Sequence, residues 1–85
     1  MINRDRLLER FLRYVVIATT SDPDADGYPS SAGQWELGKL LVDELVAMGL
    51  AESCQDDHGL VWATLESNST TVVPTIAWNA HLDTS

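Results

Sequence analysis

The feature that most constrains this chain is an apolar run near its carboxyl end, residues 72–80, which reads VVPTIAWNA. Its apolar residues follow one another without the alternation of a half-exposed strand, which indicates a β-strand covered on both faces. Pro74 has no N–H to donate in mid-ladder, so we place it at the start of the strand. Such a strand needs neighbouring strands at its edges and helices on both faces.

Two amphipathic helices are predicted upstream of this strand. Residues 4–17 repeat apolar side chains at helical spacing, and Asn3 is the expected N-cap. The second helix is expected to begin at Ser30 or Ser31, because Ser31 and Gln34 match a capping box. Gly49 is placed to end that helix in a left-handed conformation.

After the second helix the pattern changes to that of strands. Residues 50–55 and 60–65 predict an antiparallel hairpin, and residues 57–59, Asp-His-Gly, supply its turn. The order is therefore α-α-β-β-β. Two helices and two further strands cannot cover a doubly buried strand completely. We expect an α/β fold with a mixed sheet, a truncated α-α-β-β-β segment of a larger domain.

Charge and cysteine content exclude several classes of partner. The formal net charge of -8 repels nucleic acid and anionic membrane surfaces, so neither is an expected partner. The single cysteine, Cys54, allows no internal disulfide and fits a reducing compartment. The start of the chain lacks the apolar stretch of a signal peptide, and no run reaches the roughly 18 apolar residues of a membrane span. The expected location is the cytoplasm.

Chemistry is concentrated in the motif His81-Leu82-Asp83, which follows the apolar run directly. In open α/β sheets, ligands bind outside the carboxyl ends of the strands. If strand geometry persists, His81 and Asp83 point to the same face, because side chains alternate. An imidazole can bind a metal while a carboxylate fixes its tautomer. Taken alone, however, a His-x-Asp motif more often marks a surface or capping histidine.

Other polar and aromatic groups favour structural roles. An acidic run in the first loop lacks the glycine and terminal glutamate of an EF-hand in register, so we interpret it as a hydrated loop. A histidine beside two aspartates is interpreted as a solvated hairpin tip, the cysteine as a small strand residue, and the tryptophans as core or interface residues. The residues concerned are Asp22, Asp24 and Asp26; His58 with Asp56 and Asp57; Cys54; and Trp35, Trp62 and Trp78.

Several blocks of the sequence resemble one enzyme family. Residues 76–85, IAWNAHLDTS, are similar to the first metal motif of the M20 metallopeptidases, an apolar strand followed by His-x-Asp-Thr. The final serine and residues 29–35, PSSAGQW, resemble the tripeptide aminopeptidase branch of that family. Residues 7–15 are similar to its first helix, and residues 48–50 and 61–65 fall where it has a helix end and a second strand. The resemblance spans nearly the whole chain.

This resemblance implies a zinc-peptidase catalytic domain of the phosphorylase/hydrolase-like type, of which residues 1–85 are an incomplete amino-terminal part with no second domain. It implies a two-zinc aminopeptidase that releases the N-terminal residue of tripeptides. By that likeness His81 is a metal ligand, and Asp83 is the catalytic carboxylate that orients it. The family's other ligands and its glutamate base follow this motif. Residues 1–85 are therefore expected to bind zinc weakly or not at all and to be inactive alone.

Two alternatives remain open at this stage. The chain can be a small non-catalytic interaction module derived from the same fold, self-associating through an exposed sheet edge. It can also be a fragment of another M20 branch, a carboxypeptidase or a deacylase. In the leading interpretation a peptide is the substrate of the complete enzyme. The isolated chain is expected to associate or to be marginally stable, because its last strand lacks partners.

Overall fold

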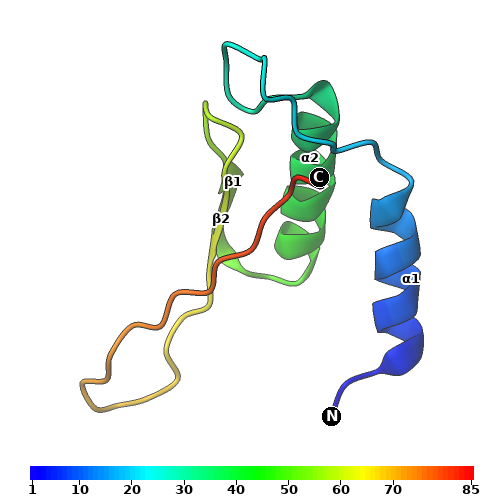
Figure 1. Ribbon diagram of the computed structural model, residues 1–85. Coiled ribbons are helices and arrows are strands. Elements are labelled where there is room, and N and C mark those ends of the chain that lie inside the picture. The colour runs from blue at the N-terminus through cyan, green and yellow to red at the C-terminus, as the bar shows by residue number, and fades with distance from the viewer.

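The computed structural model describes residues 1–85 and contains four regular elements. These are α1 (Arg4–Val15), α2 (Ala32–Ala47), β1 (Ala51–Gln55) and β2 (Val61–Thr64). The two strands form an antiparallel hairpin that packs against α2, while α1 stands apart on the other side of α2 in the view of Figure 1. After β2 the chain makes a long excursion and then returns towards α2. Neither helix has the length and apolar composition needed to cross a bilayer.

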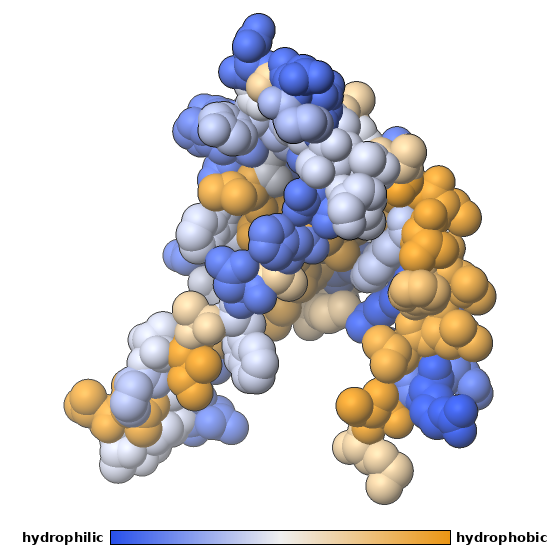
Figure 2. All heavy atoms as spheres, viewed as in Figure 1, coloured by the Kyte–Doolittle hydropathy of each residue, from blue (hydrophilic) through white to orange (hydrophobic).

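Helix α1 begins as its sequence predicts and ends two residues early. Asn3 is the N-cap, and its Oδ1 accepts a hydrogen bond from the backbone N–H of Arg6 at 3.1 Å. The apolar stripe of α1 is more than half exposed along its length and forms an apolar band in Figure 2. Its members are Leu7, Leu8, Phe11, Leu12 and Val15. Within this chain, α1 therefore gains little stability from burial of apolar surface.

Helix α2 ends as predicted, in a Schellman motif. Gly49 has a φ of +80°, a conformation in which a residue with a Cβ is strained. Its N–H donates to the carbonyl of Val46 at 2.9 Å, and the N–H of Leu50 donates to that of Leu45 at 3.1 Å. These two bonds satisfy carbonyls that the helix itself leaves without partners.

The predicted capping box at the start of α2 is wrong. Ser31 occupies the N-cap position, but its side chain makes no capping hydrogen bond and its buried Oγ has no partner. The Gln34 side chain does not reach back to Ser31. It donates instead to the backbone carbonyl of Thr19 and to Ser30 Oγ. A long-range contact has replaced the local one that the pattern suggested.

The hairpin is confirmed within one residue at each end. Its register pairs Ala51 with Thr64 but Cys54 with Trp62, so β1 carries one residue more than β2 across this interval. Glu52 lies in the extra stretch and has a φ of +56°. The irregularity is a β-bulge, which bends the strand and increases its twist.

The hairpin meets α2 at a glycine. A Cβ on Gly38 would lie 2.0 Å from Gln55 Nε2, so the end of the Gln55 side chain occupies the space that a side chain at Gly38 would fill. Gln55 Nε2 donates to the carbonyls of Trp35 and Gly59, each at 3.4 Å. Leu37 is the one buried hydrophobic side chain, at 8% exposure. Polar contacts thus hold much of this small core together.

The predicted third strand is wrong. Residues 72–80 form neither helix nor strand, and Val72, Ile76 and Trp78 are 104%, 76% and 95% exposed. The hairpin leaves one edge of β1 and one edge of β2 free, but residues 72–80 pair with neither, so this segment has no ladder. The expected mixed sheet is likewise absent, because the sheet is two-stranded and antiparallel. The coarser α/β assignment, two helices with a small sheet, is confirmed.

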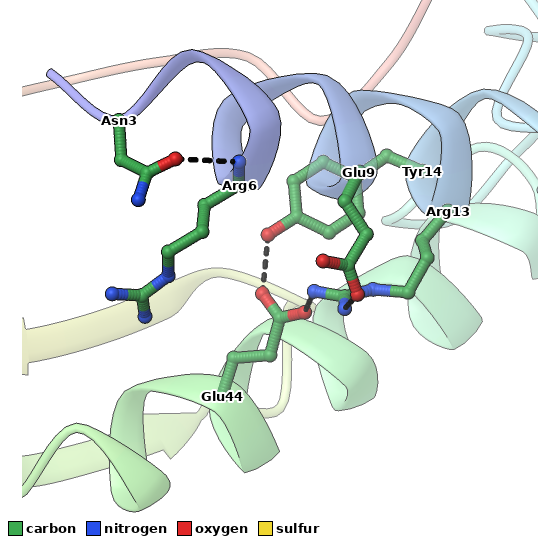
Figure 3. Close-up of polar contacts among 6 residues, drawn as sticks. All are labelled: Asn3, Arg6, Glu9, Arg13, Tyr14 and Glu44. Carbon is green, nitrogen blue, oxygen red and sulfur yellow. Dashed lines mark hydrogen bonds and ion pairs between the residues drawn. The ribbon is translucent and has the colours of Figure 1, made fainter.

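Hydrogen bonds between α1 and α2 converge on Glu44. Arg13 Nη2 and the Tyr14 hydroxyl donate to its two carboxylate oxygens, and Arg13 Nη1 also pairs with Glu9 on α1 at 3.3 Å (Figure 3). The Glu44 side chain is only 16% exposed. Burial raises the pKa of the Tyr14 phenol, and the hydrogen bond to Glu44 and the charge of that carboxylate raise it further. We call Arg13, Tyr14 and Glu44 the Glu44 junction.

The Glu44 junction should open at alkaline pH. The folded-state pKa of Tyr14 lies above its usual value of about 10, so its contribution to stability is complete below about pH 10 and is lost as pH rises through the folded pKa. Thermal unfolding midpoints between pH 8 and 12 test this, with Tyr14→Phe against Tyr28→Phe, a change at an exposed tyrosine. Wild type and Tyr28→Phe should lose more stability than Tyr14→Phe. Identical pH profiles for all three would contradict the assignment.

Candidate functional site

The carboxyl-terminal segment is held in place by one parallel bridge, between Thr20 and Thr84. The N–H of Thr84 donates to the carbonyl of Thr19 at 3.2 Å, and the N–H of Ser21 donates to the carbonyl of Thr84 at 2.9 Å. Thr19 is 4% exposed, so this contact lies in one of the few buried places of the molecule. The bridge fixes Thr84, and with it the adjacent Asp83.

The first turn of α2 supports this bridge from behind. Gln34 Nε2 donates to the carbonyl of Thr19 at 3.3 Å, so that carbonyl accepts from both Gln34 and Thr84. A Cβ on Gly33 would lie 1.6 Å from the carbonyl oxygen of Ala18, so only glycine permits this approach. The sequence did not predict this support. Residues 29–35 contain the Gly33 and Gln34 that make these contacts, but their pattern also fits a capping box.

The His81 and Asp83 side chains meet, as their spacing predicted, although they do not lie on a strand. His81 Nδ1 is 3.0 Å from Asp83 Oδ1, and the two side chains are 87% and 37% exposed. A carboxylate can only accept hydrogen bonds, so this contact requires a proton on Nδ1 whenever Asp83 is the carboxylate. In the neutral imidazole the lone pair is then on Nε2. The pair therefore presents an accessible imidazole nitrogen, and its role as a ligand pair stays a prediction.

This pair lies along a groove between the carboxyl-terminal segment, the loop before α2 and the tip of the hairpin. Three aromatic side chains line the groove, those of Tyr28, Trp62 and Trp78. His58 lines it as well, so the two histidines of the chain border one groove. The expected position of His58 at the exposed hairpin tip is confirmed. Trp62 and Trp78 are 58% and 95% exposed and are not core residues.

Asp56 fixes the hairpin tip that borders the groove. Its Oδ1 accepts from the backbone N–H groups of His58 at 2.9 Å and Leu60 at 3.0 Å. Its Oδ2 accepts from Trp62 Nε1 at 3.0 Å. The indole N–H, followed by the two backbone N–H groups, lowers the pKa of the Asp56 carboxyl. The ionised carboxylate thus anchors both the turn and the Trp62 ring.

The residues of this chain do not by themselves fit a zinc ion. No three histidine, cysteine, aspartate or glutamate side chains converge on a point that could hold a metal. His81 and Asp83 offer at most two donors, whereas a catalytic zinc takes three protein ligands and a water. In the acidic loop, Asp22 Oδ1 accepts from the N–H of Asp24 at 3.0 Å, as in a local turn. Cys54 is free and exposed on β1.

The His81 tautomer tests the geometry of the pair. With Asp83 present, long-range ¹H–¹⁵N correlation spectra of the neutral imidazole should show mainly the Nδ1–H form of His81. Asp83→Ala should move the tautomer ratio towards Nε2–H by about fivefold, the factor expected for one lost hydrogen bond. His58 serves as the internal control and should not change. A wild-type His81 that is mainly Nε2–H would contradict the observed hydrogen bond.

The chain is similar to curated proteins named Peptidase T. It is 49% identical over 82 residues to that of Geobacillus thermodenitrificans (strain NG80-2), and 48% and 50% identical to those of Shouchella clausii (strain KSM-K16) and Bacillus thuringiensis (strain Al Hakam). Each alignment covers 96% of this chain and 20% of the relative. No protein-family model matches the chain. The similarity predicted from the motifs is confirmed as similarity to proteins named Peptidase T, and the chain spans about a fifth of the length of these relatives.

Proposed function

We propose that this chain is the amino-terminal part of a zinc-dependent aminopeptidase that releases the N-terminal residue of tripeptides. Its similarity to proteins named Peptidase T indicates a segment of a peptidase. The observation that carries the finer proposal is the His81–Asp83 pair, which presents an imidazole nitrogen fixed by a carboxylate. A carboxylate that orients a ligating histidine is the usual arrangement at zinc sites in proteins.

In this proposal His81 is one zinc ligand, through Nε2, and Asp83 is the carboxylate that sets its tautomer and orientation. The other ligands would come from outside residues 1–85, because this chain brings no third donor to the pair. It follows that the 85-residue chain alone binds zinc weakly and does not hydrolyse peptides. The 85-residue chain is expected to be inactive because its set of zinc ligands is incomplete, and not because His81 is wrongly oriented.

The groove suits a small peptide as the proposed substrate. Aromatic rings on its walls and polar atoms at His81 and Asp83 give the mixture of apolar surface and a few polar groups that is typical of ligand sites. Cytoplasmic location is part of the same proposal, since a free, exposed thiol such as Cys54 suits a reducing compartment. The matches to Peptidase T favour the aminopeptidase branch over a carboxypeptidase or a deacylase.

An interaction module is the second candidate, and the exposed apolar stripe of α1 favours it. Each strand of the two-stranded sheet also has one edge without a partner strand, to which another copy could add. In this case the chain would form a defined dimer. Size-exclusion chromatography with light scattering separates the candidates, because a monodisperse dimer favours the module, while aggregation favours a segment of a larger domain.

A chimera tests the aminopeptidase proposal. In this chimera, the 82 aligned residues of the Geobacillus thermodenitrificans relative are replaced by the corresponding residues of this chain. The unmodified relative is the positive control. The chimera should hydrolyse a tripeptide. His81→Ala should lower kcat/KM by more than about a hundredfold, and Asp83→Ala by about ten- to a hundredfold, as expected for a ligand and its orienting carboxylate.

Asp57→Ala, at the exposed hairpin tip, is the matched control and should leave kcat/KM nearly unchanged. The 85-residue chain, assayed in parallel, should release no amino acid. Circular dichroism of each chimera checks that loss of activity is not loss of fold. Full turnover by the His81→Ala chimera would end the assignment of His81 as a ligand.

A further inference from the structure

We propose that Gln34 is a positioning residue for the His81–Asp83 pair and acts through the backbone carbonyl of Thr19. This inference rests on the proposed function, because the position of the pair matters only if the pair acts in the proposed peptidase. Its basis is that one buried carbonyl accepts two hydrogen bonds, from Gln34 Nε2 on one side and from the N–H of Thr84 on the other.

Gln34 is buried, and its side-chain nitrogen donates twice in this arrangement. It is 6% exposed, and the two hydrogens on Nε2 match two acceptors, the Thr19 carbonyl at 3.3 Å and Ser30 Oγ at 3.1 Å. Thr19 is itself 4% exposed, so water is a poor substitute for a lost partner. A buried carbonyl that loses a donor keeps the cost of its desolvation. Removing the Gln34 donor therefore weakens the anchor of the Thr19 segment on α2.

A change that weakens the anchoring of Thr19 also weakens the anchoring of the His81–Asp83 pair. Thr84 is held by its N–H to Thr19 and by its carbonyl to the N–H of Ser21, and Asp83 is its direct neighbour. No regular strand fixes this segment otherwise. Gln34 also lines the same groove as His81 and Asp83, so the support lies close to the pair that it serves.

Gly33 shows that the approach of α2 to this segment is tight. The carbonyl of Ala18 already fills the space that a Cβ at this position would occupy, so the first turn of α2 lies against the backbone just before Thr19. An alanine here would gain some helix propensity. The overlap with a backbone oxygen is the larger effect. Gly33 and Gln34 thus both hold the Thr19 segment against α2. Gly33 allows the close approach because it has no side chain, and Gln34 donates a hydrogen bond.

The test compares two glutamines in the 85-residue chain. Gln34→Met removes the donor and keeps the length of the side chain. Gln55→Met is the matched control, because Gln55 Nε2 also donates to two backbone carbonyls but holds the hairpin to α2, not Thr19. The readouts are amide hydrogen exchange at Thr84 and the tautomer ratio of His81 at a fixed pH. A purely structural role would alter both variants alike.

We expect Gln34→Met to speed exchange at Thr84 by about five- to tenfold, the factor for one lost hydrogen bond, and to shift the His81 tautomer ratio. Gln55→Met should change neither readout. If Gln34→Met fails to fold, Gln34→Glu keeps the shape, lacks the donor when ionised, and should give the same two changes. Unchanged Thr84 exchange, or equal effects from both glutamine positions, would overturn the inference. Failure of the peptidase proposal would appear separately, as full activity of the His81→Ala chimera.

Discussion

One buried carbonyl, that of Thr19, joins the parts of this molecule that matter for its proposed site. It accepts from Gln34 at the start of α2 and from the N–H of Thr84 in the carboxyl-terminal segment. The segment has no ladder of its own, so these bonds and the N–H of Ser21 decide where it lies. The His81–Asp83 hydrogen bond then orients the imidazole. Without the Thr19 contact the two residues would still be neighbours in sequence, but only the bond from the N–H of Ser21 to the carbonyl of Thr84 would hold their segment at the groove.

The local elements could be predicted because local chemistry determines them. Asn3 caps α1 through a bond to the residue three positions later, and Gly49 ends α2 with a backbone that glycine favours. The turn of the hairpin is closed by Asp56, next to the predicted Asp-His-Gly. Each of these contacts spans only a few residues, so the pattern of the sequence contains all that it needs.

The long-range features could not be predicted in the same way. Residues 72–80 have the composition of a doubly covered strand, but composition does not decide pairing, and this segment pairs with neither free edge of the hairpin. Gln34 fits a capping box by spacing, yet its acceptor, Thr19, lies fifteen residues away. The spacing of His81 and Asp83 did place them together, because two residues so close in sequence can meet without a strand.

The exposed apolar surfaces agree with the proposal that this is part of a larger enzyme. Only Leu37 is a buried hydrophobic residue, and the stripe on α1 and the side chains of Ile76 and Trp78 are exposed. Hydrogen bonds at Glu44, Gln55 and Gln34 connect α1, the hairpin and the Thr19 segment to α2. The proposal requires that other parts of a longer protein cover these faces. The polar arrangement around Thr19 needs no such cover, because its donors and acceptors all lie within residues 1–85.

Scalar couplings across hydrogen bonds test the central contact most directly. In ¹⁵N, ¹³C-labelled protein, the Thr84 nitrogen should couple to the carbonyl carbon of Thr19, and the Ser21 nitrogen to that of Thr84, since these bonds are 3.2 and 2.9 Å long. Couplings within α2 provide the internal standard. Observation of both couplings would support the account. Their absence, with those of α2 present, would show that Thr19 does not hold the segment that carries His81 and Asp83.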